Sequence, residues 1–167
     1  MKTLVAYATK YGGTKSCAER LARKLPQGTE LVELTQGMQV DLAPYDTVIV
    51  GCSIYMGKPR KEAMDFCQRF EKELMQKNVG LFLCCMQDMD KAVKQQMALA
   101  FPRPLQEHAS SLGVLGGVVN YTKLSRKDAF IMKMVVGDLR KKTEDGTLST
   151  VSDERIDRFL ELLAGAR

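Results

Sequence analysis

The chain has 167 residues, of which 45% are hydrophobic and 27% charged, and this size and composition predict one globular domain over residues 1–167. Its net charge of +5 and pI of about 9.0 suit an anionic partner, but the absence of tryptophan and of a basic stripe interleaved with aromatics argues against nucleic-acid binding. Five cysteines without C-x-x-C spacing and a single histidine exclude a multi-histidine metal site, and no segment is typical of a signal peptide or membrane span, so we expect a cytoplasmic protein without a metal.

The first elements in the chain are a buried strand over residues 2–8 and a helix whose apolar residues recur from Ala18 to Leu25. The loop between them reads Thr9-Lys10-Tyr11-Gly12-Gly13-Thr14. Because its N–H groups and hydroxyls converge at a helix N-terminus, which favours negative charge, the loop is a candidate phosphate site. The alternative is an ordinary tight turn in which Thr14 caps the helix. The glycine pattern matches neither a P-loop nor a Rossmann fingerprint.

Strands and helices alternate along the rest of the chain. Apolar runs predict further strands over 29–33, 47–52, 79–85 and 113–120, and helical spacing predicts helices over 63–74, 93–101, 127–139 and from Ser152, as the cap, to Leu163. Continuous apolar strands separated by amphipathic helices predict a parallel sheet covered on both faces. Five such strands fit a doubly wound, three-layer α/β sandwich of strand order 2-1-3-4-5, in which a ligand binds beyond the carboxyl ends of strands one and three.

The loop after the third strand is therefore expected to share a site with the first loop. It reads Ser53-Ile54-Tyr55-Met56-Gly57-Lys58. Its aromatic and apolar residues offer the flat walls that an isoalloxazine ring needs, although a half-exposed loop aromatic is the alternative role of Tyr55. The loop after the fourth strand, Met86-Gln87-Asp88-Met89, is expected to form a third wall, with core filling as the alternative for its methionines. Two such loops at the carboxyl ends of strands one and three, where the winding of the sheet reverses, favour FMN as the cofactor.

A response-regulator receiver shares this architecture, but it needs an acidic pair after the first strand and an aspartate after the third. Thr9-Lys10 and Cys52-Ser53 stand at those places, so the sequence excludes a receiver. Adjacent Cys84 and Cys85 do not suggest a redox pair, because neighbouring residues of a strand point to opposite faces.

The whole chain resembles the flavodoxin superfamily and, within it, the branch that contains menaquinone-dependent protoporphyrinogen oxidase. The first loop with Lys10 carries the resemblance, together with residues 51–57, which are similar to a Gly-Ala-Ser-Ile-x-x-Gly loop, and weaker matches at 117–121, 130–133 and 152–153. The resemblance implies FMN held by the three loops. It also implies an oxidoreductase that oxidises a porphyrinogen or a similar planar substrate with a quinone acceptor. No catalytic residue is assigned, because the flavin itself carries such chemistry.

Two departures from the family pattern leave other functions open. Tyr11 replaces a threonine of typical flavodoxins, so only its backbone N–H carries over, and the segment 87–112 looks shorter than the Arg-rich insertion of the porphyrinogen oxidases. The alternatives are a flavodoxin-type electron carrier between redox proteins and a binding module without flavin. Typical carriers resemble acidic proteins, so the charge of +5 argues against a carrier.

Basic residues lead to two further expectations. Lys10 and Lys58 place positive charge in the two main loops, which predicts a higher reduction potential for the bound flavin than in an acidic flavodoxin. The helix over 127–139 combines lysines with Phe130, Ile131, Met134 and Val135, so it could rest on the inner face of an anionic membrane. We favour the alternative, a core helix with a solvated basic end.

Overall fold

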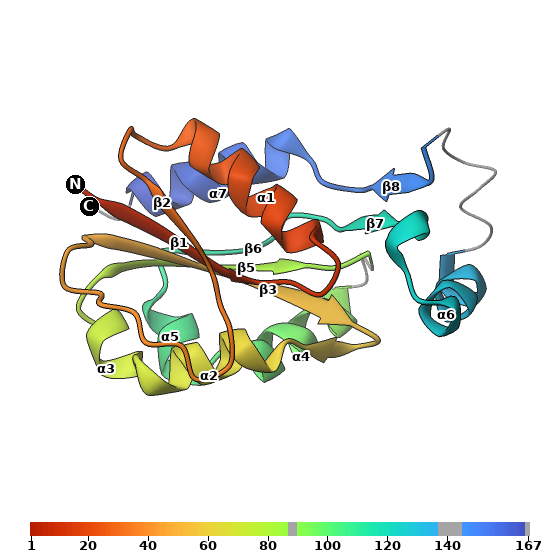
Figure 1. The fold of residues 1–167 in the computed structure, drawn as a ribbon. Coiled ribbons are helices and arrows are strands. Elements are labelled where there is room, and N and C mark those ends of the chain that lie inside the picture. The colour runs from red at the N-terminus through yellow and green to blue at the C-terminus, as the bar shows by residue number, and fades with distance from the viewer. Residues whose placement is uncertain (87–89, 137–144, 166–167) are drawn as a thin grey trace.

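The computed structural model describes residues 1–86, 90–136 and 145–165, and a mostly parallel sheet lies at its centre (Figure 1). The strands lie in the order β2 (Glu30–Glu33), β1 (Thr3–Ala8), β3 (Thr47–Tyr55), β5 (Asn78–Cys84) and β6 (Ser111–Val114), each parallel to its neighbours. A short β4 (Lys58–Pro59) pairs antiparallel with the end of β3. The predicted order 2-1-3-4-5 of five parallel strands is confirmed.

Helices cover both faces of this sheet, which gives three layers (Figure 1). On one face lie α1 (Gly13–Lys24) and α7 (Asp153–Gly165), and on the other lie α2 (Lys61–Arg69), α3 (Glu71–Leu74), α4 (Asp90–Ala100) and α5 (Arg103–His108). Side chains alternate between the faces along each strand. Val5 packs with the α1 and α7 layer, whereas Leu4 and Ala6 pack with the opposite layer. The inner strands are apolar along their length because both faces are buried.

One close contact inside the sheet explains a glycine within β3. A Cβ placed on Gly51 would lie 2.1 Å from the ring of Phe82 in β5. The phenylalanine therefore occupies the space that the missing side chain leaves, and it also packs edge-on against Phe159 of α7 at 6.1 Å between ring centroids. This packing ties the middle of the sheet to the C-terminal helix.

The predicted fifth strand over 113–120 is wrong as a single element. The chain leaves the main sheet after β6, and β7 (Val118–Asn120) pairs antiparallel with β8 (Thr147–Ser149) in a separate two-stranded sheet. Gly116 lies at the break with φ +99°, and a Cβ placed on it would lie 2.3 Å from the carbonyl oxygen of Thr150. Only glycine fits both this backbone conformation and this contact.

Two predicted helices also differ from the structure. The helix expected over 63–74 is divided at Phe70 into α2 and α3. The helix expected over 127–139 is α6 (Arg126–Val136), which follows a 3₁₀ turn (Tyr121–Lys123) between β7 and β8, and the rest of its predicted range lies outside the described residues. Ser152 caps α7 as predicted, because its Oγ accepts a hydrogen bond from Arg155 N at 3.4 Å. None of the helices described is both long and apolar enough to cross a membrane.

Candidate functional site

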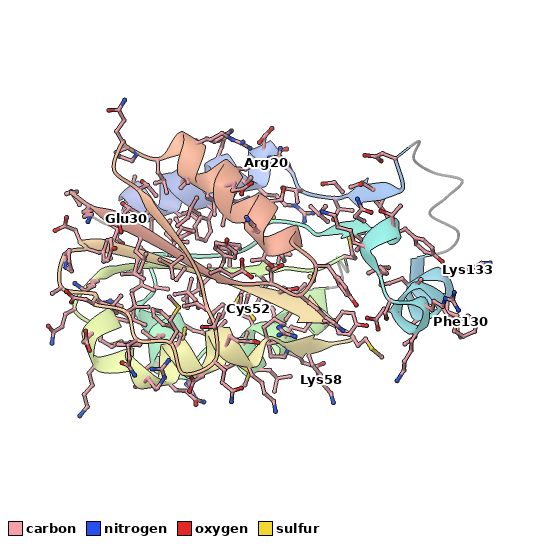
Figure 2. All side chains as sticks on the ribbon, in the orientation of Figure 1. Arg20, Glu30, Cys52, Lys58, Phe130 and Lys133 are labelled. Carbon is pink, nitrogen blue, oxygen red and sulfur yellow. The ribbon has the colours of Figure 1, made fainter. Side chains whose placement is uncertain are left out.

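The loops after β1, β3 and β5 meet at the carboxyl end of the sheet and enclose a cavity of about 400 Å³, a size typical of small-molecule sites. Many of the predicted site residues line it, namely Lys10, Tyr11, Gly13, Thr14, Ser53, Ile54, Tyr55, Met56, Gly57 and Met86. Thr9 and Gly12 shape the first loop without lining the cavity, and Lys58 lies exposed on β4, where Figure 2 shows it pointing away from the sheet. Gln87, Asp88 and Met89 lie outside the described residues.

The first loop presents a helix N-terminus to the cavity. Gly12 is the N-cap of α1 with φ +86°, and its N–H donates to Thr9 Oγ1 at 3.0 Å. The alternative that Thr14 caps the helix is therefore wrong, because Thr14 lies inside the first turn. That turn contains no acidic residue, so the positive end of the helix dipole is not offset locally.

The hydroxyl of Thr14 is buried and makes no hydrogen bond of normal geometry with the described residues. Its neighbour is the thiol of Cys84: burial and contact with Cys17 raise the pKa of this thiol, and the Thr14 hydroxyl lowers it, so the thiol stays neutral and is only a weak partner for the hydroxyl. A buried polar group left unpaired costs roughly 1–3 kcal/mol. Because Thr14 lines the cavity, a ligand bound there would supply the missing partner.

The second loop is a tight hairpin that holds Tyr55 at the cavity. Strand β3 runs to Tyr55, three residues beyond its predicted end, and the pairing of Tyr55 with Lys58 leaves Met56 and Gly57 as the turn. Both turn residues have positive φ, +50° and +73°. A two-residue hairpin turn of this kind requires positive φ at both positions, which is costly for methionine, and such strained residues cluster at functional sites. Met56 is 60% exposed at the tip, whereas Tyr55 is half-buried.

A carboxylate from α6 joins the two loops. The side chain of Asp128 accepts hydrogen bonds from the phenols of Tyr11 and Tyr55, and Lys10 Nζ lies 3.2 Å from it. Lys10 Nζ also lies 3.5 Å from the centre of the Tyr55 ring. We call Lys10, Tyr11, Tyr55 and Asp128 the Asp128 cluster.

The charges within the Asp128 cluster stabilise one another. The phenols of Tyr11 and Tyr55 hold the pKa of the Asp128 carboxyl well below its usual range. Burial lowers the pKa of the Lys10 ammonium, but the contacts with Asp128, Tyr55 and Tyr11 together outweigh burial, so the pKa is raised. Burial and the bond to Asp128 raise the pKa of Tyr55. The positive charge of Lys10 is therefore largely offset, which weakens the prediction of a high flavin potential.

Sequence reasoning missed Asp128 because it lies 118 residues from Lys10. The available signal was that Asp128 is the one carboxylate in an otherwise basic stretch, residues 121–136. It also missed a fourth wall of the cavity, which Val118, Val119, Leu124, Ile131 and Met132 form. The carbonyl oxygen of Val118 would lie 2.7 Å from a Cβ on Gly13, so β7 packs directly against the first loop.

A second hollow of about 670 Å³ lies between the C-terminal ends of α2 and α4. Its wall includes Arg69, Lys72 and Arg103. Because the helices run antiparallel to the strands, this hollow lies at the opposite end of the sheet from the three loops. We place the functional site at the loops, where the unpaired Thr14 hydroxyl and the strained hairpin converge.

Comparisons with known proteins agree with this architecture. A family model described as a flavodoxin domain matches residues 4–146. Among solved structures, a short-chain flavodoxin associated with a non-canonical PDU bacterial microcompartment is 17% identical, with a TM-score of 0.59 over 99% of both chains. A flavodoxin from Streptococcus pneumonia TIGR4 is 19% identical, with a TM-score of 0.52 over 100% of both chains. Oxidised flavodoxin 1 from Bacillus cereus is 16% identical, with a TM-score of 0.52 over 86% of this chain and 99% of its own. At these identities the likeness shows the fold, and no curated protein matches the chain.

Proposed function

Because the chain belongs to the flavodoxin-domain family, we propose that it binds FMN in the cavity at the carboxyl end of the sheet and acts as an oxidoreductase. The observation that carries the proposal is the buried, unpaired hydroxyl of Thr14. A phosphate oxygen is the acceptor that this hydroxyl lacks, and a helix N-terminus without acidic residues favours the phosphate charge. The residues of the cavity therefore fit the cofactor of the family.

Each loop has its own part in holding the cofactor. The first loop, residues 9–14, would bind the phosphate through its N–H groups and the Thr14 hydroxyl, while Thr9 fixes the position of Gly12. Ile54, Tyr55 and Met86 would contact the ring, because they supply apolar and aromatic surface on the cavity wall. When bound, FMN supplies electron and hydride transfer.

The polar side chains around the cavity hold the hairpin and α6 in position and do not transfer protons. Asp128 stays ionised at neutral pH because its pKa is held low, so it acts as a hydrogen-bond acceptor. Tyr55 keeps its proton because its pKa is raised by burial and by Asp128. Together with Lys10 they fix the hairpin and α6 across one side of the cavity and reduce the access of water to it.

For the substrate we propose a porphyrinogen or a similar reduced molecule that becomes planar on oxidation, with a quinone as electron acceptor. The loop over residues 51–57 supports this proposal through its similarity to the porphyrinogen oxidase branch. The apolar fourth wall supports it as well, because Leu124, Ile131 and Met132 suit the hydrophobic surface of such a substrate. The chain carries a net charge of +5, which suits the carboxylates of a porphyrinogen.

The second candidate function is one-electron transfer between redox proteins. The observation that favours it is the hairpin tip, where Met56 is 60% exposed beside the cavity and is accessible to a partner protein. A carrier would show no turnover of small substrates unless a partner protein is present.

The deciding experiment reconstitutes the purified protein with FMN and follows porphyrinogen oxidation and quinone reduction together under anaerobic conditions. We expect FMN to bind in a one-to-one ratio and both reactions to proceed without another protein. Three quinones should be reduced for each porphyrin formed, because a porphyrinogen loses six electrons and each quinone takes up two. Binding of FMN without turnover would instead support the carrier. No binding of FMN would refute both functions and indicate a binding module without flavin.

A further inference from the structure

The outer face of α6 exposes two large apolar side chains. Phe130 is 66% exposed and Met134 is 75% exposed. They are four residues apart, so they lie one above the other on the same side of the helix. Figure 2 shows Phe130 and Lys133 on the side of α6 that faces away from the sheet. The favoured prediction of a core helix is therefore wrong for these two residues.

Basic residues flank this apolar pair on both sides. Arg126, Lys127 and Lys133 are exposed, and each lies within four residues of Phe130, on the same half of the helix. Asp128, the one carboxylate within Arg126–Val136, points the opposite way and pairs with Lys10. The outer face thus combines an apolar centre with positive charge only.

We propose that this outer face of α6 docks on the surface of an anionic lipid bilayer. Apolar side chains at the centre of a short helix with cations on both flanks are the pattern of helices that lie in a membrane interface. Phe130 and Met134 enter the apolar region, while Arg126, Lys127 and Lys133 meet the phosphates of the lipid headgroups.

The size of the patch favours a membrane over a protein partner. A stable protein interface uses roughly 20–30 residues on each side, many of them apolar at its centre. The apolar centre on α6 consists of two side chains, and α6 lies at the edge of the molecule, away from the main sheet (Figure 1). A bilayer needs no complementary shape, so one helix face of this kind is sufficient.

Docking in this way would bring the cavity close to the bilayer. Ile131 and Met132, on the inner half of α6, line the cavity. A quinone dissolved in the bilayer would then have a short path to the site. This consequence rests on the proposed function, whereas the docking itself does not.

Flotation of the full chain with lipid vesicles tests the docking, both without FMN and after incubation with it. We expect the protein to float with vesicles that contain phosphatidylglycerol and to remain unbound with pure phosphatidylcholine. Each basic residue near an anionic surface contributes about fivefold to partitioning. The Lys127→Glu/Lys133→Glu variant should therefore bind at least about 25-fold more weakly, and Phe130→Ser/Met134→Ser should also bind more weakly.

Matched controls change the same residue types elsewhere on the surface. Lys61→Glu/Lys72→Glu and Leu99→Ser/Leu162→Ser alter exposed residues on α2, α3, α4 and α7 and should float like the wild type. Circular dichroism checks that every variant is folded. Equal binding to neutral vesicles, no binding at all, or binding that ignores the α6 variants would refute the proposal. So would a dimer in sedimentation analysis that Phe130→Ser/Met134→Ser dissolves, because the patch would then bind a second copy. If the wild-type protein binds FMN but does not float with the vesicles, only the docking is refuted.

Discussion

Replacing Thr14 by valine should weaken the contact of the protein with the phosphate of the cofactor and leave its contact with the ring unchanged. Valine has nearly the same shape as threonine, so the packing around this buried position is kept while the hydroxyl is removed. In the complex, the hydroxyl would donate a charge-assisted hydrogen bond to the phosphate, which contributes about 1.5–3 kcal/mol. At room temperature this corresponds to a loss of roughly 10- to 160-fold in the affinity for FMN.

Riboflavin provides the internal comparison, because it has the same ring but no phosphate. Its affinity should change by less than about twofold, since the 1.5–3 kcal/mol bond is absent from its complex. Fluorescence titration of both flavins measures the two losses in parallel. Thr14→Ser keeps the hydroxyl and should bind FMN within a few-fold of the wild type. Equal losses for FMN and riboflavin would contradict the assignment of Thr14 to the phosphate.

Thr14→Val should also change the stability of the protein without its cofactor. Since the Thr14 hydroxyl is buried without a partner, its removal should stabilise the apoprotein by up to roughly 1–3 kcal/mol. For a chain of this size that is about 2–4 °C in Tm per kcal/mol. Thr9→Val is the matched control and should lower Tm, because Thr9 Oγ1 accepts a hydrogen bond from Gly12 N that this variant loses. A lower Tm for Thr14→Val would show that the hydroxyl has a partner and refute the reasoning.

Three other variants test the remaining parts of the site. Tyr55→Ala should weaken FMN and riboflavin equally, by ~1 kcal/mol or more, because the ring contact is common to both, and unchanged riboflavin affinity would remove Tyr55 from the wall. Asp128→Asn should lower the hydrogen-exchange protection of α6. In the wild type the Asp128 carboxylate stabilises the fold at pH values above its unfolded pKa of about 3.9. This contribution is lost as the pH falls through the lower pKa of the folded state. Loss of the hydrogen-exchange protection of α6 already near pH 6 would therefore argue against the Asp128 cluster. Lys10→Glu/Lys58→Glu should lower the reduction potential of bound flavin while Asp128→Asn raises it, as spectroelectrochemistry at low salt can measure, and identical potentials would show that these charges do not reach the flavin.

The sequence alone determined the elements that local patterns control. The strands expected over 2–8, 47–52 and 79–85 are apolar at nearly all buried positions, the exceptions being Thr3 and Thr47 where two of the strands begin, and few other structures accommodate such runs. Their alternation with amphipathic helices then restricted the topology, because parallel strands need crossover helices and right-handed connections. The position of the site followed from this topology, since the loops at the switch point necessarily meet.

Tertiary structure decided where the pattern was ambiguous. The apolar run over 113–120 was compatible with one strand, and its division depends on Gly116, which fits against the carbonyl of Thr150 only because β8 packs there. The extension of β3 to Tyr55 likewise depends on its pairing with β4. Neither contact changes the hydrophobic periodicity of its segment, so the periodicity does not predict it.

The Asp128 cluster and the two faces of α6 were also decided by tertiary structure. The spacing of Arg126–Val136 predicts a helix, but it does not say which side is buried, because apolar residues occur on both sides. The contact of Asp128 with Lys10 orients the helix, turns Ile131 and Met132 to the cavity and leaves Phe130 exposed. Local sterics and periodicity fix elements over a few residues, whereas an ion pair between residues 118 positions apart forms only after the sheet has brought their loops together.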